Sequence, residues 1–543
     1  MSNGVWTMPV PKNEPVYNYG PGSPEKQRIK AELARLSSET VEIPLLIGGK
    51  EIRTGDTDVC VMPHNHGHKL GIYHKAGPKE VEAAINAALE AQKAWAALSW
   101  EQRAGIFLKA AEMISAEWRY TLNAATMLGI SKTVYQAEID STCELADFWR
   151  FNVHYMEEIY RQQPASSPGV WNRVEYRPLE GFIFAVTPFN FTAIAGNLPT
   201  APAMMGNTVV WKPASSAVYN AYFVIKLLQE AGLPPGVINF IPGSGSAIGR
   251  QVMAHPDLAG IHFTGSTAVF QDMWKTVGGN IDRYKAYPRL VGETGGKDFV
   301  FAHPSADIDS LRTALIRGAF EYQGQKCSAA SRAYIPRSIW EKLRDDLVSQ
   351  TRELTMGDVS DFTNFMGAVI DRDAFERIKG YIDYAANSSE ARILAGGGCD
   401  DSVGYFIEPT IVETSNPKFK LMEEEIFGPV LTIYVYEDKD LEQTLELCDT
   451  TSPYGLTGAI FAQDRYAIEK MTRALTQAAG NFYVNDKPTG AVVGQQPFGG
   501  GRASGTNDKA GSMLNLLRWV SPRAIKENLV PPRDHRYPHM DQA

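Results

Sequence analysis

The chain has 543 residues, 44% of them hydrophobic and 21% charged, a composition that excludes disordered and fibrous proteins. This length exceeds one simple core and predicts two domains with smaller appendages. The net charge of −9 argues against binding to nucleic acid or to an anionic membrane surface, and the lack of a long apolar run argues against a membrane span.

The N-terminal residues predict an irregular arm over 1–30. They are rich in Pro and Gly, have no apolar stretch of a secretory signal, and place Glu14 soon after the first basic residue, Lys12. Secretory signals and Arg-rich transit peptides both fit poorly. We therefore expect a cytoplasmic protein, although a mitochondrial matrix protein numbered after removal of its leader would look the same.

The cysteines and histidines give no metal or disulfide pattern. The five cysteines are odd in number and scattered, with no CxxC pair, so one of them can be a reactive thiol. The HNHGH segment at 64–68 lies among Pro, Asn and Gly without a nearby acidic or thiol partner. We expect it to be a solvated loop rather than a metal site.

The first part of the chain predicts helices. Apolar residues recur at helical spacing over 80–98, 102–114 and 136–160. The segment 162–169 (QQPASSPG) then breaks the pattern.

A strand–helix rhythm follows. Short apolar runs occupy 181–186, 207–211, 237–241 and 260–263, with a helical segment at 217–231. This alternation predicts a parallel sheet covered by helices on both faces. A second alternating stretch over 306–490 predicts another α/β unit, with helices at 308–322 and 372–386 and a strand at 430–435.

The loops after these strands are candidate ligand sites, because open α/β sheets bind ligands at the carboxyl ends of their strands. They cover residues 187–191, 212–215, 243–249 and 264–266. The glycines of 243–249 give G-x-G-x-x-x-G, one residue longer than the dinucleotide fingerprint, which argues against an ordinary Rossmann enzyme.

Four motifs carry a family resemblance. TPFNF at 187–191, VGETGGK at 291–297, QGQKCS at 323–328 and EEIFGPV at 424–430 together resemble the aldehyde dehydrogenase superfamily. The segments 189–194, 324–329, 493–500 and 502–509 (FNFTAI, GQKCSA, VGQQPFGG, RASGTNDK) are similar to its Δ1-pyrroline-5-carboxylate dehydrogenase branch. That branch oxidises L-glutamate γ-semialdehyde to L-glutamate in proline catabolism.

The resemblance implies an α/β aldehyde dehydrogenase fold. A Rossmann-like NAD-binding domain would cover 31–160 and 181–300, and an α/β catalytic domain 301–510. Residues 161–180 and 511–543 would form a small oligomerisation flap and tail, so we expect a homodimer or a higher homo-oligomer. A separate proline dehydrogenase is a candidate partner that would pass its product, the substrate of this enzyme, directly to this chain.

The catalytic residues expected from the resemblance fit the chemistry. Cys327 would attack the aldehyde, since a thiolate is strongly nucleophilic. The Asn190 amide and the Cys327 backbone N–H would stabilise the oxyanion. Glu293 would activate the water that hydrolyses the thioester, and partial burial would raise its pKa toward neutrality.

The resemblance also assigns cofactor contacts. Lys212 and Ser215 would bind the adenosine ribose, with Thr187 nearby. Gly265 and Ser266 would bind the pyrophosphate, Glu425 the nicotinamide ribose, and Phe427 would lie against it. Many NAD-specific relatives carry Glu where this chain has Ser215, so NAD is expected and NADP stays open as a poorer substitute.

The substrate contacts are the most specific expectation. Ser328 and the backbone N–H groups of Gly490 and Ala491 would bind the α-carboxylate. Phe191 and Phe498 would sandwich the methylenes, and Glu144 would meet the ammonium. The rival interpretations are another semialdehyde dehydrogenase, such as one for succinate semialdehyde, and a catalytically silent binding protein on the same fold.

Overall fold

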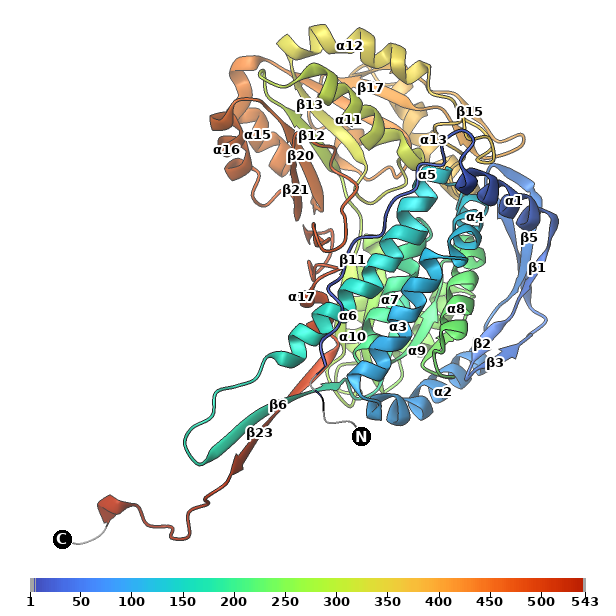
Figure 1. Ribbon diagram of the computed structural model, residues 1–543. Helices are drawn as coiled ribbons and strands as arrows, with labels where there is room; N and C mark the ends of the chain where they lie inside the picture. Colours follow the sequence, from blue (N-terminus) through green and yellow to red (C-terminus); the bar gives the residue numbers. More distant parts are fainter. Residues whose placement is uncertain (1–3, 5, 541–543) are drawn as a thin grey trace.

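The computed structural model describes residue 4 and residues 6–540, so the extreme ends of the expected arm and tail lie outside the described residues. Figure 1 shows two α/β lobes and a long two-stranded ribbon that projects away from both. The lower lobe holds the N-terminal half of the chain, and the upper lobe holds residues from about 300 to 500.

The sheet of the first lobe has seven strands. Their order is β11-β10-β7-β8-β9-β2-β3, and the five strands from β11 to β9 run parallel, while β2 and β3 pair antiparallel at one edge. The strands are β2 (Leu45–Ile47), β3 (Lys50–Ile52), β7 (Phe182–Val186), β8 (Thr208–Lys212), β9 (Ile238–Phe240), β10 (Leu258–Thr264) and β11 (Arg289–Glu293). The four predicted strands are confirmed, within one or two residues at each end.

Helices cover both faces of this sheet, because alternate strand residues enter two different cores. Phe182 and Phe184 pack with α2, α9 and α10, whereas Ile183 and Ala185 pack with α3, α7 and α8. The helices are α2 (Pro78–Ala97), α3 (Trp100–Ser115), α4 (Trp118–Ile130), α7 (Thr192–Met204), α8 (Val218–Ala231), α9 (Gly245–Met253) and α10 (Thr267–Gly279).

The predicted helix over 136–160 is more complex than its sequence pattern. It runs as α5 (Val134–Ala137), a π-helical segment η1 (Glu138–Glu144) and α6 (Leu145–Arg161). Glu138 and Asp140 in η1 are buried. Such π-helical turns are rare and frequently occur at functional sites.

The N-terminal region wraps around the first lobe. After an extended arm come α1 (Pro24–Ser38) and a three-stranded sheet of β1 (Val41–Ile43), β5 (Asn65–His74) and β4 (Thr57–Met62). The expected solvated loop at 64–68 is wrong: residues 65–68 belong to β5, and His64 is buried. The reason is tertiary contact, because His64 Nδ1 lies 3.2 Å from Ser131 Oγ and the Tyr405 N–H donates to the Pro63 carbonyl.

The second lobe repeats the architecture. Its sheet has the order β14-β17-β18-β13-β12-β20-β21, parallel except for β14. The strands are β12 (Asp298–Ala302), β13 (Ala330–Pro336), β14 (Ala391–Ala395), β17 (Thr410–Thr414), β18 (Val430–Tyr436), β20 (Thr457–Phe461) and β21 (Asn481–Val484). Helices α11 (Ile308–Phe320) and α12 (Arg337–Arg352) cover one face, and α13 (Arg372–Ala386), α15 (Leu441–Thr450) and α16 (Arg465–Ala474) the other.

The predicted helix over 372–386 is confirmed, and the predicted strand over 430–435 is one residue longer. The helix predicted for 308–322 ends earlier, at Phe320. It ends there because Tyr322 and Gln323 adopt positive φ values of 53° and 56°, which a right-handed helix cannot contain.

The ribbon joins distant parts of the chain. Strand β6 (Val170–Pro178) pairs antiparallel with β23 (Val520–Asn528) over nine residue pairs. The expected flap segments 161–180 and 511–543 contain these strands. Short helix α17 (Met513–Leu517) leads the chain from the second lobe into β23.

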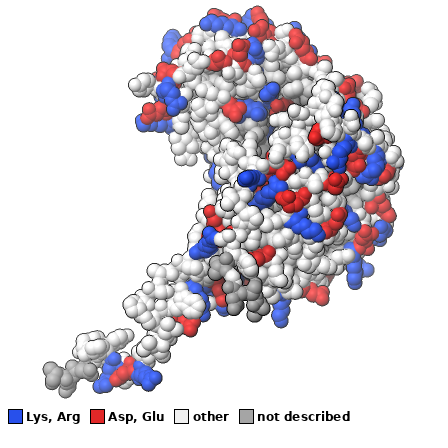
Figure 2. Space-filling view, in the orientation of Figure 1, with Lys and Arg blue, Asp and Glu red and all other residues white. Residues whose placement is uncertain are grey.

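Charged side chains of both signs are interspersed over the visible face of the molecule, without a field of one sign (Figure 2). Among the described residues, every helix is too short or too polar to cross a membrane.

Candidate active site

The candidate site forms where loops of the first lobe meet a loop of the second. Glu293 ends β11 and Asn190 follows β7, both at the carboxyl end of the first sheet. The loop 321–329, which carries Cys327, approaches them from the second lobe. The structure thereby brings the three expected catalytic residues together.

The Cys327 loop is held in a specific backbone conformation. Tyr322, Gln323 and Gly324 have consecutive positive φ values of 53°, 56° and 65°. A Cβ at Gly324 would lie 2.2 Å from the Gly428 carbonyl oxygen, so only glycine fits. The Gln323 side chain donates to the Ser131 carbonyl at 3.0 Å, which ties the turn to the first lobe.

The side chains of Cys327 and Glu293 are in contact and share a hydrogen bond. Burial and the adjacent Glu293 carboxylate raise the pKa of the Cys327 thiol well above its ordinary value, so the resting thiol is protonated. Burial raises the pKa of Glu293 to about 7, although a hydrogen bond with the thiol opposes this shift. Glu293 Oε1 is buried and has no hydrogen-bond partner among the described residues. The carboxyl is thus poised to exchange a proton near neutral pH.

Asn190 contacts the same loop. It is buried, and its Nδ2 donates to the Gln325 carbonyl at 3.0 Å. An amide donor fixed at this point can also face an oxygen bonded to the carbon that Cys327 attacks.

Two buried charges hold the start of α7, two residues after Asn190, and neither was predicted from the sequence. Asp140 accepts hydrogen bonds from the N–H groups of Thr192 (3.0 Å) and Ala193 (2.8 Å) at the start of α7. Lys132 Nζ pairs with the Asp140 carboxylate at 2.7 Å. Their sequence gave no usable signal, because an Asp inside a helical pattern normally faces solvent.

The residues expected to bind the adenosine ribose lie at the carboxyl ends of β7 and β8. The Trp211 Nε1 donates to Thr187 Oγ1 at 3.0 Å, and Ser215 begins a short 3₁₀ turn. Lys212 is 8% exposed, its Nζ has no hydrogen bond or ion pair to any described residue, and burial lowers the pKa of this amine to about 8. A buried amine without a partner is costly, so this site fits a polar ligand such as a ribose hydroxyl.

Gly265 and Ser266 stand at the N-terminus of α10. The Gly265 N–H donates to the Glu293 carbonyl at 3.2 Å, which ties this turn to the end of β11. The Ser266 hydroxyl makes no capping hydrogen bond to the helix in the described structure. The first N–H groups of a helix of this length attract anions, so the turn fits a pyrophosphate.

Glu425 and Phe427 come from the second lobe. Glu425 Oε1 accepts a 2.9 Å hydrogen bond from the Gly296 N–H, within the loop that follows Glu293. Burial raises the pKa of the Glu425 carboxyl. The Phe427 ring meets Phe189 edge to face, with centroids 5.8 Å apart.

The expected substrate residues occupy two places. Ser328 Oγ lies 2.8 Å from Thr489 Oγ1, next to Gly490, whose φ is +96°. Thr489 is a further polar group at this end, and it was not predicted from the sequence.

A second place is a cavity lined by Glu144, Glu293 and Phe498 together with residues of α7, β10 and the 499–510 loop. Phe191 is not part of that lining, and its ring lies 3.7 Å from Lys132 Nζ. Burial and the nearby Asp140 raise the pKa of Glu144 well above its ordinary value, while Lys132 opposes the shift. A bound ammonium would favour its ionised form.

Known proteins resemble this chain over nearly its whole length. A mitochondrial delta-1-pyrroline-5-carboxylate dehydrogenase of Dictyostelium discoideum is 54% identical over 536 residues, covering 98% of this chain and 96% of that protein. The crystal structure of the corresponding Mycobacterium tuberculosis enzyme bound with NAD is 54% identical, with a TM-score of 0.97 and full coverage of both chains.

A proline utilization A (PutA) protein from Bdellovibrio bacteriovorus is 31% identical, with a TM-score of 0.90. Its match covers 96% of this chain and 54% of the PutA chain. The model of the aldehyde dehydrogenase family matches residues 53–521. With this match and the arrangement of Cys327, Glu293 and Asn190, the chain belongs to the aldehyde dehydrogenase family.

Proposed function

We propose that this protein oxidises L-glutamate γ-semialdehyde, the open form of Δ1-pyrroline-5-carboxylate, to L-glutamate with NAD in the second step of proline catabolism. The observation that carries the reaction type is the buried Cys327–Glu293 pair. The full-length identity of 54% to enzymes named for pyrroline-5-carboxylate supports the substrate.

The reaction begins with the thiol. Ionised Glu293 accepts the Cys327 proton, and the thiolate adds to the aldehyde carbon to give a hemithioacetal. The Asn190 amide and the Cys327 N–H stabilise its oxyanion. NAD, when bound, supplies the hydride acceptor. After Glu293 has released the thiol proton to solvent, it removes a proton from water, which attacks the thioester on Cys327, so that the acid leaves and the Cys327 thiolate is regenerated.

The residues that would hold NAD fit its polar groups. The unpartnered Lys212 amine and Ser215 suit the adenosine ribose, with Thr187 adjacent. The α10 N-terminus at Gly265 and Ser266 suits the pyrophosphate. Glu425 and Phe427 serve the nicotinamide ribose. Ser215 stands where an acidic residue would repel a 2′-phosphate, so NADP can serve as a poorer substitute.

The amino-acid end of the substrate selects it. Ser328 and the N–H groups of Gly490 and Ala491 bind the α-carboxylate. Phe191 and Phe498 enclose the methylenes, and Glu144 receives the ammonium. Binding energy at this remote end orients the aldehyde over Cys327.

The protein acts as a homodimer or a higher homo-oligomer through the β6–β23 ribbon. In one chain this ribbon projects from the body and exposes Trp171, which a partner subunit would cover. A separate proline dehydrogenase is the proposed channelling partner, supported by the match to part of a PutA chain. Cytoplasm is the proposed compartment, with the mitochondrial matrix as the alternative that the name of the Dictyostelium relative supports.

Formation of NADH from a panel of aldehydes tests the function. We expect kcat/KM for glutamate semialdehyde to exceed that for succinate semialdehyde and for propanal. A preference for succinate semialdehyde would favour the rival dehydrogenase. Absence of turnover with every aldehyde, together with an unreactive Cys327 in thiol titration, would favour a silent binding protein.

A further inference from the structure

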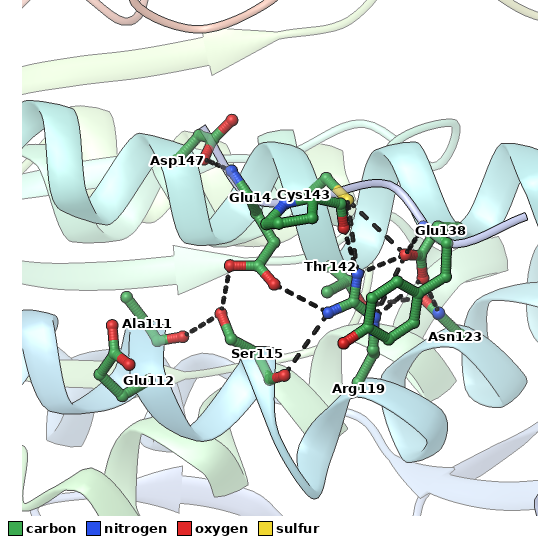
Figure 3. A network of polar contacts seen from close by, with 12 residues as sticks. Glu14, Ala111, Glu112, Ser115, Arg119, Asn123, Glu138, Thr142, Cys143 and Asp147 are labelled. Atoms are coloured by element: carbon green, nitrogen blue, oxygen red, sulfur yellow. Dashed lines mark hydrogen bonds and ion pairs between the residues drawn. The ribbon is translucent and has the colours of Figure 1, made fainter. Parts of the chain in front are cut away.

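The extended N-terminal arm packs on the helices behind the candidate substrate site. Figure 3 shows Glu14 of the arm among Ser115, Arg119 and Asp147 of three different helices. Glu14 and Tyr19 of the arm are buried. The arm is therefore an integral part of the first lobe in this region.

Asn13 joins three separate segments. Its Nδ2 donates to Asp147 Oδ2 at 2.7 Å and to the Val493 carbonyl at 2.8 Å. Its Oδ1 accepts from Gln495 Nε2 at 2.9 Å. One amide side chain thus connects α6 to the loop that begins at Gly490, three residues before Val493.

The loop has little freedom to move elsewhere. Val493 is buried, and Gly494 adopts a φ of +81°. A Cβ at Gly494 would lie 2.1 Å from the Phe151 ring, so the loop is closely packed on α6. The Val492 N–H also donates to the Gln496 side chain at 2.9 Å. A shift at Val493 would therefore be transmitted to Ala491 and Gly490 along a short, tight segment.

The same arm also holds the π-helical segment that ends at Glu144. The Tyr17 N–H donates to Glu138 Oε1 at 2.8 Å, and the Tyr19 hydroxyl donates to Glu138 Oε2 at 2.7 Å. Arg119 pairs with both Glu138 and Glu14, and its Nη1 lies 2.8 Å from Glu14 Oε1. Buried carboxylates need such partners, because an unpaired buried charge is very costly.

We propose that arm residues 13–19 are a specificity element that sets the spacing between the α-carboxylate and ammonium contacts of the substrate, with Asn13 as its positioning residue. The inference rests on the proposed function. Tyr17 and Tyr19 hold η1 and thus Glu144, while Asn13 holds the 490–495 loop. Asn13 itself contacts neither η1 nor Cys327, Glu293 or Asn190, so removal of its side chain leaves the groups of the aldehyde chemistry in place.

The test compares Asn13→Ala with wild type on glutamate semialdehyde and on propanal, which lacks the amino-acid end. We expect KM for glutamate semialdehyde to rise about three- to tenfold, the effect of losing a hydrogen bond of ordinary strength. We expect kcat for that substrate and both constants for propanal to change less than about twofold.

Two further variants sharpen the comparison. Gln495→Ala removes one of the two Asn13 contacts to the loop and leaves the Asn13–Val493 hydrogen bond, so it should raise KM in the same direction by a smaller factor. Added to Asn13→Ala it should cause no further rise, because both changes cut one connection. Asn18→Ala is the matched control on the same arm, since its side chain is exposed and accepts only from the Gly20 N–H at 3.1 Å.

Hydrogen exchange of amides 490–495 gives a readout that is independent of turnover. Faster exchange in Asn13→Ala than in Asn18→Ala supports the connection. Equal losses on both aldehydes, or no change in KM and exchange, would overturn the inference. A wild-type enzyme without preference for glutamate semialdehyde would refute the proposed function and with it the specificity role, while exchange would still decide whether Asn13 holds the loop.

Discussion

The side chain of Asn190 donates a 3.0 Å hydrogen bond to the carbonyl of Gln325, two residues before Cys327. This contact links the loop after β7 to the loop that carries Cys327, across the two lobes. An amide held there is pre-positioned for an oxyanion, because it needs no reorganisation during the reaction.

Asn190→Ala should therefore lower kcat by about 10²- to 10³-fold, the usual cost of one oxyanion donor. NAD affinity should stay close to that of wild type, because Asn190 is not one of the residues assigned to the cofactor. Steady-state kinetics and a fluorescence titration with NADH measure the two quantities. A loss below tenfold would remove Asn190 from the oxyanion site.

Cys327→Ala should abolish aldehyde oxidation while leaving NAD binding largely intact, since the nucleophile is lost and the cofactor loops are unchanged. Cys399→Ser is the control, because Cys399 lies in the short strand β15 (Cys399–Asp400) of the second lobe. Its catalysis should remain measurable. Normal turnover by Cys327→Ala would contradict the assignment of the nucleophile.

Glu293→Gln keeps the size of the side chain and removes the base. If the main role of Glu293 is hydrolysis, rapid mixing with aldehyde and NAD should give a burst of NADH followed by slow turnover. Loss of the burst would mean that Glu293 is needed to deprotonate Cys327, an earlier step that its contact with the thiol also permits.

The pKa of about 7 at Glu293 predicts the pH dependence of both rate and stability. The rate should rise with pH up to about 7, because only the ionised carboxylate acts as a base. The folded protein holds the Glu293 proton more tightly than the unfolded chain does, because the pKa of Glu293 is about 7 when folded and 4.5 when unfolded. The stabilisation that comes from the bound proton is complete below pH 4.5 and is lost as the pH rises through 7.

Relative to Glu293→Gln, wild type should therefore lose up to about 3 kcal/mol of stability between pH 4.5 and 7. Thermal unfolding of both proteins at a series of pH values measures this difference. A difference in Tm that is constant with pH would show that Glu293 titrates near its ordinary value.

Ser328→Ala should impair glutamate semialdehyde selectively. Losing a hydrogen bond to a charged group costs roughly 1–3 kcal/mol, which predicts a fall in kcat/KM of about five- to 150-fold. Propanal, which has no carboxylate, should be little affected. The specificity ratio of wild type and mutant is the measurement, and an unchanged ratio would mean that the carboxylate is bound elsewhere.

The sequence predicted the central strands of the first lobe well, because each is an apolar run buried on both faces. Strands β2 and β3 were not predicted, since they are short and their pairing depends on the distant edge of β9. The family motifs identified Cys327, Glu293 and Asn190, which the structure brings together. Their roles remain predictions.

The supporting charges could not be predicted. Lys132, Asp140 and Glu138 are buried only because partners from other segments satisfy them, and some of those partners are more than 100 positions away. A charged residue in a helical pattern normally indicates a solvated face. His64 misled for the same reason, because its Pro, Asn and Gly neighbours suggest solvent while its actual environment is Ser131 and the 401–405 segment.

The β6–β23 ribbon has a consequence for synthesis of the chain. Arg177 and Ser521, which pair across it, are 344 positions apart, so β6 leaves the ribosome long before its partner exists. During that interval its backbone hydrogen-bonding groups are unpaired, and an unpaired strand edge is a template for aggregation. Nascent chains that end between β6 and β23 should therefore need chaperones most. A stop codon before Val520 should yield a protein that aggregates, even though the loops with the expected NAD contacts and the loop with Cys327 are complete.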